Sequence, residues 1–341
     1  MKFISYLHTM AGMLVVAAAM TTFTSCSKDD DEGNGEGNGG PTTLTTPKFE
    51  SVSACYEITS SNSNLKSIEL TASGNYIIVK KGAYSRPAYS FSDFLTVTDE
   101  GDTRATEYNN IIKGKFTKIS DTEFELEGFG RIVIKGGTSS ATSLEITPTG
   151  GQAYTLTAVE KTQNPDSEKT TWLCRTWAFY AFKMKMVMKQ DGKSCTVIDG
   201  KYKMTDEEKF RKDIVAGMKR AYQTFYPQEY SQMKEQADRA AEEAAKNITF
   251  DTEGRPEQVI FTKAGTYMVT YKGNRLGIST WSWKDEAKGL MNYSWDYNSS
   301  SQGTVEVGFF GNQLTIKEGG NTSSNGYNMD AEVTYYMEEV K

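Results

Sequence analysis

The sequence predicts a mainly β protein of two antiparallel β-barrel-like domains, the second carrying an inserted helical hairpin. Short segments that alternate apolar and polar residues, separated by turn-forming clusters, recur from residue 48 onward. Two of these segments form an internal repeat. Only at residues 205–247 does the period of the pattern change from two to that of a helix.

The first 32 residues have the pattern of an export signal followed by an acidic run. Residues 1–25 hold a lysine near the start and an apolar stretch, at residues 10–20, that is too short to span a bilayer. The following FTSC at residues 23–26 resembles the lipobox of bacterial lipoproteins. SKDDDE at residues 27–32 resembles the surface-export signal of Bacteroidetes lipoproteins. The alternative is an ordinary secretory signal peptide followed by an acidic linker.

This resemblance implies that Cys26 is acylated and becomes the first residue of the mature chain. The protein would then be anchored in outer-membrane lipid without spanning the membrane, and would face the cell exterior.

The mature chain divides by composition into a tether, two β domains and a linker. Residues 26–47 are rich in glycine and acids and poor in apolar residues, which predicts a disordered tether. We expect the first β domain at residues 48–161, a polar linker at 162–170 and the second β domain at 171–341. Their combined length suits two domains better than one.

The internal repeat consists of SIELTASGNYIIV at residues 67–79 and QVIFTKAGTYMVT at 258–270. The matched positions include a glycine and a tyrosine in each copy: Gly74 with Gly265, and Tyr76 with Tyr267. Each copy predicts a β-hairpin with a tight turn at the glycine. We interpret the pair as a divergent duplication; the alternative is chance similarity between strands flanked by turns.

Alternation predicts further strands in the first domain. Their apolar pairs are Ile68 with Leu70, Phe124 with Leu126, and Ile132 with Ile134. Residues 91–97 are more continuously apolar and are also expected to form a strand.

Residues 205–247 predict two helices inserted into the second domain. One apolar stripe repeats at helical spacing: Phe210, Ile214, Met218, Tyr222 and Phe225. Thr205 and Glu208 are expected to form a capping box at its start. Pro227 interrupts the pattern, and an alanine- and glutamate-rich helix is expected from about residue 228 to 246. We expect the pair to pack on the β domain as a lid or buttress; docking of a partner is the alternative.

Together, the lipobox, the acidic run and the duplicated hairpin are similar to the tandem lipocalin-like, or calycin-like, lipoproteins of Bacteroidetes. The resemblance implies small antiparallel barrels of about eight strands, whose interiors are either a ligand cavity or a packed core. The GxW motif of lipocalins has its nearest equivalent at Thr176 and Trp177, and the first domain contains no tryptophan.

The composition excludes several functions. The one histidine, His8, lies in the signal peptide, so the mature chain has neither a histidine-dependent catalytic triad nor a histidine-ligated metal site. Without residues 1–25 the chain has 37 basic and 44 acidic residues, because 38 − 1 = 37, and a net charge of −7. This balance argues against nucleic acid as a partner. We expect no cofactor and no metal.

The other cysteines, Cys55, Cys174 and Cys195, have no partner at metal-ligand spacing. Each is expected to be a small buried residue. No catalytic residue is assigned. A hydrolase that uses Asp285, Glu286 and Asp296 is the remaining enzymatic alternative.

Five rings on alternate positions provide the candidate ligand site: Trp281, Trp283, Tyr293, Trp295 and Tyr297. Because alternate residues of a strand share a face, two strands paired around residues 284–291 would bring these rings together. The residues between them would then face water: Ser282, Lys284, Ser294, Asp296 and Asn298. The rings either fill the barrel interior or, with Trp177, line its mouth.

The sequence therefore favours a lipid-anchored surface protein that binds a small hydrophobic or glycan ligand in the second barrel. The first alternative is a structural or interaction lipoprotein with packed barrels and an envelope protein as partner. The second alternative is a carboxylate-based secreted hydrolase.

Overall fold

The computed structural model describes residues 52–81, 110–138, 141–246, 248, 255–294, 302–324 and 327–340. Several predictions lie outside these residues: the signal peptide, the acylated Cys26, the tether, the strand at 91–97, and Trp295, Asp296, Tyr297 and Asn298. Within the described part of the chain, no helix is long and apolar enough to cross a membrane.

The first barrel is formed by eight antiparallel strands in chain order, and β8 closes the sheet by pairing with β1. The strands are β1 (Ala54–Ile58), β2 (Leu65–Leu70), β3 (Asn75–Lys80), β4 (Ile111–Ser120), β5 (Glu123–Leu126), β6 (Gly130–Thr138), β7 (Ala141–Pro148) and β8 (Tyr154–Glu160). The predicted alternation is confirmed, since Phe124, Leu126 and Ile132 all point into one buried core.

The second barrel also closes with eight antiparallel strands. They are β9 (Thr176–Gln190), β11 (Pro256–Phe261), β12 (Thr266–Tyr271), β13 (Arg275–Asp285), β14 (Leu290–Ser294), β15 (Gln302–Phe310), β16 (Gln313–Ser324) and β17 (Tyr327–Glu339). A short 3₁₀ turn, η4 (Lys272–Asn274), joins β12 to β13. The mainly β prediction with two barrels is confirmed.

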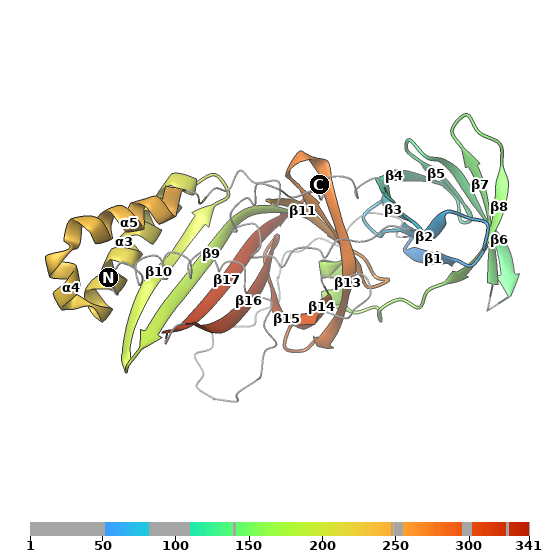
Figure 1. Cartoon of the computed structure of the whole chain (residues 1–341). Helices are drawn as coiled ribbons and strands as arrows, with labels where there is room; N and C mark the ends of the chain where they lie inside the picture. Colours follow the sequence, from blue (N-terminus) through green and yellow to red (C-terminus); the bar gives the residue numbers. More distant parts are fainter. Residues whose placement is uncertain are drawn as a thin grey trace.

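Strand β9 is long enough to belong both to the barrel and to an extension of the sheet beyond it. Its first residues pair with β11 inside the barrel, while residues 181–190 pair with β10 (Lys193–Lys203). On its other edge β9 pairs with β17 along almost its whole length. The sheet therefore continues beyond the barrel as an extension made of β10, β9, β17 and β16 (Figure 1).

The helical insertion packs on this extension. It contains α3 (Glu207–Phe225), α4 (Pro227–Gln232) and α5 (Lys234–Lys246), at the end of the molecule away from the first barrel (Figure 1). The predicted stripe of α3 is buried in the same core as Phe182 and Tyr202 of the sheet. Gly217 lets α3 approach β10, because a Cβ there would lie 1.8 Å from the carbonyl oxygen of Val197. The insertion is thus a buttress in this structure.

The predicted capping box is wrong. The helix begins at Glu207 with Asp206 as its N-cap, and no side chain caps it. The Asp206 carboxylate instead accepts a hydrogen bond from the backbone N–H of Lys203, at 3.0 Å. Glu208 pairs with Lys212 one turn along, at 2.6 Å. The helix therefore starts one residue later than predicted, and an ion pair within the first turns engages Glu208 instead of a capping box.

The two copies of the repeat share the same hydrogen bonds. Each threonine hydroxyl at the turn accepts the backbone N–H four residues later, at 3.0 Å in Thr71 and 3.1 Å in Thr262. Gly74 and Gly265 both adopt a positive φ, at 73° and 79°. The matched tyrosines, Tyr76 and Tyr267, each donate to a backbone carbonyl at 2.7 Å. Both predicted hairpins are confirmed in atomic detail.

The outer faces of these two hairpins hold the barrels together. Ile77 and Val79 from the first copy form an apolar cluster with Ile260, Met268 and Ile278 of the second barrel. Polar contacts frame the cluster: the Asn75 amide donates to the Thr176 hydroxyl at 3.2 Å, and the Lys113 ammonium donates to the Thr270 hydroxyl at 2.7 Å. The barrels are therefore joined by packing as well as by the linker.

A glutamate is buried in this same contact. Glu69 lies on β2 with 4 % of its surface exposed, and the hydroxyls of Thr262 and Thr266 from the second barrel hydrogen-bond to its carboxyl group. Burial raises its pKa from 4.5 to about 7, against the opposing effects of the two threonines and the Lys161 charge. The folded protein therefore holds the Glu69 proton more tightly than the unfolded chain does.

This pKa shift predicts that stability falls with rising pH. The contribution of Glu69 to the free energy of unfolding is complete below pH 4.5 and is lost as pH rises through 7. A pKa unit corresponds to about 1.4 kcal/mol, so we expect a loss of about 3 kcal/mol. Glu69→Gln removes the titrating group, and urea unfolding across this pH range should then show a flatter profile than the wild type.

Glu57→Gln, on the exposed side of β1, is the matched control and should leave the wild-type pH profile in place. Parallel profiles for wild type and Glu69→Gln would show that the Glu69 carboxyl does not titrate within the contact between the barrels.

Candidate functional site

The aromatic hairpin forms as predicted from β13 and β14. Trp281 lies opposite Tyr293, and Trp283 lies opposite Met291. Trp281 and Tyr293 are buried, with 4 % and 3 % of their surfaces exposed, while Trp283 is half-buried. The two indole rings meet edge to face with their centroids 5.7 Å apart. This part of the hairpin is therefore core rather than an exposed platform.

The polar edges of the two indoles are used for structure. The Trp281 N–H donates to the backbone carbonyls of both Thr262 and Thr266, at 3.1 Å each, and so fastens β13 to the repeated turn. The Trp283 N–H donates to the Thr170 hydroxyl, at 2.9 Å, which attaches α2 (Glu168–Leu173) to the same strand. Neither indole N–H is left to orient a ligand.

The remaining described candidates are also internal. Trp177 is completely buried, and its N–H donates to the Leu173 carbonyl at 2.9 Å. The Tyr293 hydroxyl donates to the buried carboxylate of Glu318 at 3.1 Å. Trp177, Phe182, Tyr335, Leu314 and Ile316 pack in one large core. Aromatic and aliphatic side chains of the protein itself thus pack in the described interior of the second barrel.

The pattern of water-facing residues needs one correction. Ser282 and Lys284 are exposed, but Ser294 is buried with 2 % of its surface exposed. Ser294 lies at the end of β14, where it is paired with Gln302 and its carbonyl accepts the Tyr267 hydroxyl. The expectation that it faces water is wrong: Ser294 borders the cleft outside the barrel, but the chain around it covers its side chain.

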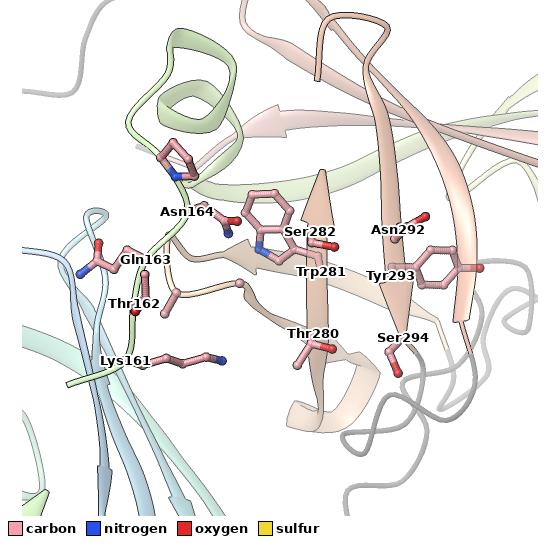
Figure 2. A pocket seen from close by; sticks show the side chains of 13 residues that line it. Lys161, Thr162, Gln163, Asn164, Thr280, Trp281, Ser282, Asn292, Tyr293 and Ser294 are labelled. Carbon is pink, nitrogen blue, oxygen red and sulfur yellow. The ribbon is translucent and has the colours of Figure 1, made fainter. Parts of the chain in front are cut away.

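An open cleft of about 320 Å³ lies outside the barrel, beside this hairpin. Lys161 and the following linker, including Asn164, form one wall, and β13 and β14 form the other (Figure 2). In Figure 2 the Lys161 ammonium reaches toward Thr280, and the Asn164 side chain lies near the indole of Trp281. The cleft borders two predicted rings, Trp281 and Tyr293, but Trp177 and Trp283 are not among its lining residues.

Sequence reasoning missed the linker side of this cleft. The linker was recognised only by its polar composition, and the Asn164-Pro165 pair indicates a turn without saying what the turn faces. Ligand sites often lie at junctions between domains, and this general preference is the one signal that could have indicated the cleft.

The carboxylates of Asp285 and Glu286, at the turn of the hairpin, accept hydrogen bonds from nearby residues. The backbone N–H of Lys288 donates to Asp285, and this bond holds the pKa of that carboxyl below its usual range. The Glu286 carboxylate accepts the Ser167 hydroxyl. Asp296 lies outside the described residues. Asp285 and Glu286 therefore serve the loop and the linker rather than forming a pair across the cleft.

Metal and thiol chemistry receive no support from the described residues. They contain no group of three His, Cys, Asp or Glu side chains that could hold a metal ion. Cys55, Cys174 and Cys195 are free and buried, as expected. Burial raises the pKa of the Cys55 and Cys174 thiols well above their usual range, which keeps both protonated.

The chain has no close relative among the family models and curated proteins compared with it, and its similarity to solved structures is low. No protein-family model matches the chain, and no curated protein does. Among solved structures, a double mutant of the vaccine antigen transferrin binding protein B from Haemophilus parasuis Hp5 matches with 7 % identity and a TM-score of 0.17, over 67 % of this chain and 43 % of that one. A single mutant of the same antigen matches with 6 % identity and a TM-score of 0.16, over 81 % and 61 %.

The chain thus covers less than two thirds of the length of either solved structure. Sequence identity and TM-scores this low say nothing about the function of this chain, which is therefore argued from its own residues.

The buried position of Trp281 predicts a structural role. Trp281→Phe should lower the free energy of unfolding by about 2 kcal/mol, because it removes the donor to two buried carbonyls and part of a packed ring. Ser282→Ala changes the exposed neighbour on the same strand and should stay within about 0.5 kcal/mol of the wild type. Urea unfolding measures both; equal stability of the two variants would contradict the structural role.

Proposed function

We propose that the protein is a lipid-anchored protein of the cell surface that binds its partner through the outside of two packed barrels. The observation that supports this proposal is the packing of buried side chains in the described interior of each barrel. Buried side chains pack as one cluster in the first barrel and as another in the second, where the largest are aromatic. Of the two non-enzymatic functions considered from the sequence, the interaction lipoprotein with packed barrels agrees better with this packing.

The way the barrels are joined also suits such a role. Besides the apolar contact between the hairpins, backbone hydrogen bonds hold the chain on both sides of the linker's start. The backbone N–H of Lys161 donates to the Cys55 carbonyl at 2.8 Å, and the backbone N–H of Asn164 donates to the Lys263 carbonyl at 2.7 Å. The two barrels, the sheet extension and the helices form one elongated body (Figure 1). Because its parts are already held in place, such a body loses little conformational entropy when a partner binds its outer surface.

The anchoring part of the proposal rests on the FTSC motif and is tested by Cys26→Ser. In a Bacteroidetes host the wild-type chain should partition with the outer membrane and incorporate radiolabelled palmitate. The variant lacks the acceptor thiol, so it should lose the label and appear in the soluble periplasmic fraction. Cys55→Ser alters a buried thiol of the folded domain and should leave the membrane fraction unchanged. Membrane association of Cys26→Ser would refute acylation at this residue.

The surface location is tested separately through the acidic run. Alanine at Asp29, Asp30 and Asp31 should retain the label and the membrane fraction but abolish digestion by protease added to intact cells. Glu36→Ala removes an acid that lies beyond the run, and should remain digestible. Full surface exposure of the triple variant would show that the run is not an export signal.

A further inference from the structure

In the cleft beside the linker, both barrels approach the same exposed space. Lys161 directly follows β8, the last strand of the first barrel, while Thr280 and Ser282 lie on β13 of the second. At about 320 Å³ the cleft is at the lower end of the range of about 300–1,000 Å³ usual for small-molecule sites. It is large enough for a small ligand.

Both walls of the cleft are held by hydrogen bonds that do not involve the space between them. On the linker side, the Gln163 amide donates to the Ser53 carbonyl in the first barrel. On the hairpin side, the backbone N–H of Trp281 donates to the Gly265 carbonyl at 2.8 Å, in addition to its two indole bonds. The site is therefore formed before any ligand arrives, which lowers the ordering cost of binding.

Several polar side chains line the cleft without being hydrogen-bonded within the described chain. Among the described residues, the side chains of Lys161, Asn164, Thr280 and Ser282 make no hydrogen bond or salt bridge with one another or with the rest. The Asn292 carbonyl oxygen accepts the Thr304 hydroxyl at 3.0 Å, and its amide nitrogen is left for a ligand. Hydroxyls and amides can both donate and accept, as a ligand rich in hydroxyls requires.

The charge of the residues that line the cleft narrows the class of ligand further. Lys161 is the charged residue among those that line it, and none of the described lining residues is acidic. One ammonium among neutral hydroxyl and amide groups favours a single carboxylate on an otherwise neutral ligand. A phosphate would need a cluster of backbone N–H groups or arginines, and the described lining residues include no arginine.

We propose that this cleft binds a saccharide that carries a carboxylate, of the uronic acid class. The Lys161 ammonium pairs with the carboxylate, and Asn164, Thr280, Ser282 and Asn292 hydrogen-bond to ring hydroxyls. The proposal deepens the proposed function, on which it rests only in placing binding outside the barrels. Its test measures binding in solution, so its failure is distinguishable from a failure of membrane anchoring or surface export.

The test is calorimetric titration of the full mature protein with D-glucuronic acid and a uronic acid disaccharide, compared with D-glucose and inorganic phosphate. Both uronic acids should bind more tightly than glucose, and phosphate should not bind. Lys161→Met should weaken uronic acid binding roughly tenfold or more, because a charge-assisted hydrogen bond is lost. Lys161→Arg retains the charge and should bind within a few fold of the wild type.

Lys284→Met is the matched control, since Lys284 is an exposed lysine of β13 that does not line the cleft, and it should bind like the wild type. Thermal melting of each variant shows whether it is folded, and Ser282→Ala gives a second, exposed probe of the cleft. The proposal is overturned if neither uronic acid binds, if glucose or phosphate binds as well as they do, or if folded Lys161→Met binds them as the wild type does.

Discussion

The packing of one repeated hairpin on the other holds the rest of this molecule in place. Ile77 of β3 and Met268 of β12 occupy matched positions of the two copies, and both contribute to the apolar cluster between the barrels. Because the linker leaves β8 and must reach β9 across this contact, the contact fixes the route of the linker. The route in turn places Lys161 opposite Thr280 and creates the external cleft. A change in the hairpin contact would therefore alter the geometry of the cleft.

The duplication explains both the likeness and the asymmetry of this contact. The threonine, glycine and tyrosine that build each turn are the same in both copies, so each hairpin presents a similar outer face. The matched positions Glu69 and Ile260 differ. Glu69 is buried against the hydroxyls of the second copy, whereas Ile260 joins the apolar cluster. A carboxyl group at one copy alone avoids the repulsion that two buried carboxylates would produce, and makes the contact sensitive to protons.

The sequence predicted those features that depend on local chemistry. Glycine at a positive φ, tyrosine two residues later and strict alternation specify a hairpin and its buried face, and the barrels follow from several such hairpins. The capping box failed because the helix starts one residue later than predicted, with Asp206 as its N-cap, and because Glu208 pairs with Lys212. The expectation for Ser294 failed because alternation identifies the outer face of a strand but not the distant segments, such as the linker, that lie beside that face. The cleft could not be predicted, because Lys161 and Thr280 meet only through the tertiary contact.

The fate of the aromatic rings determines what kind of binding this surface can support. An indole serves a ligand by offering its face for stacking and its N–H for orientation. Trp281 offers almost none of its surface and donates its N–H twice to the turn of the repeat. Its contribution to the cleft is rigidity rather than contact area. Recognition must then come from the polar side chains above it, where an ill-fitting ligand would leave groups unpaired. Such a site discriminates by the pattern of hydroxyl and carboxylate groups more than by hydrophobic area.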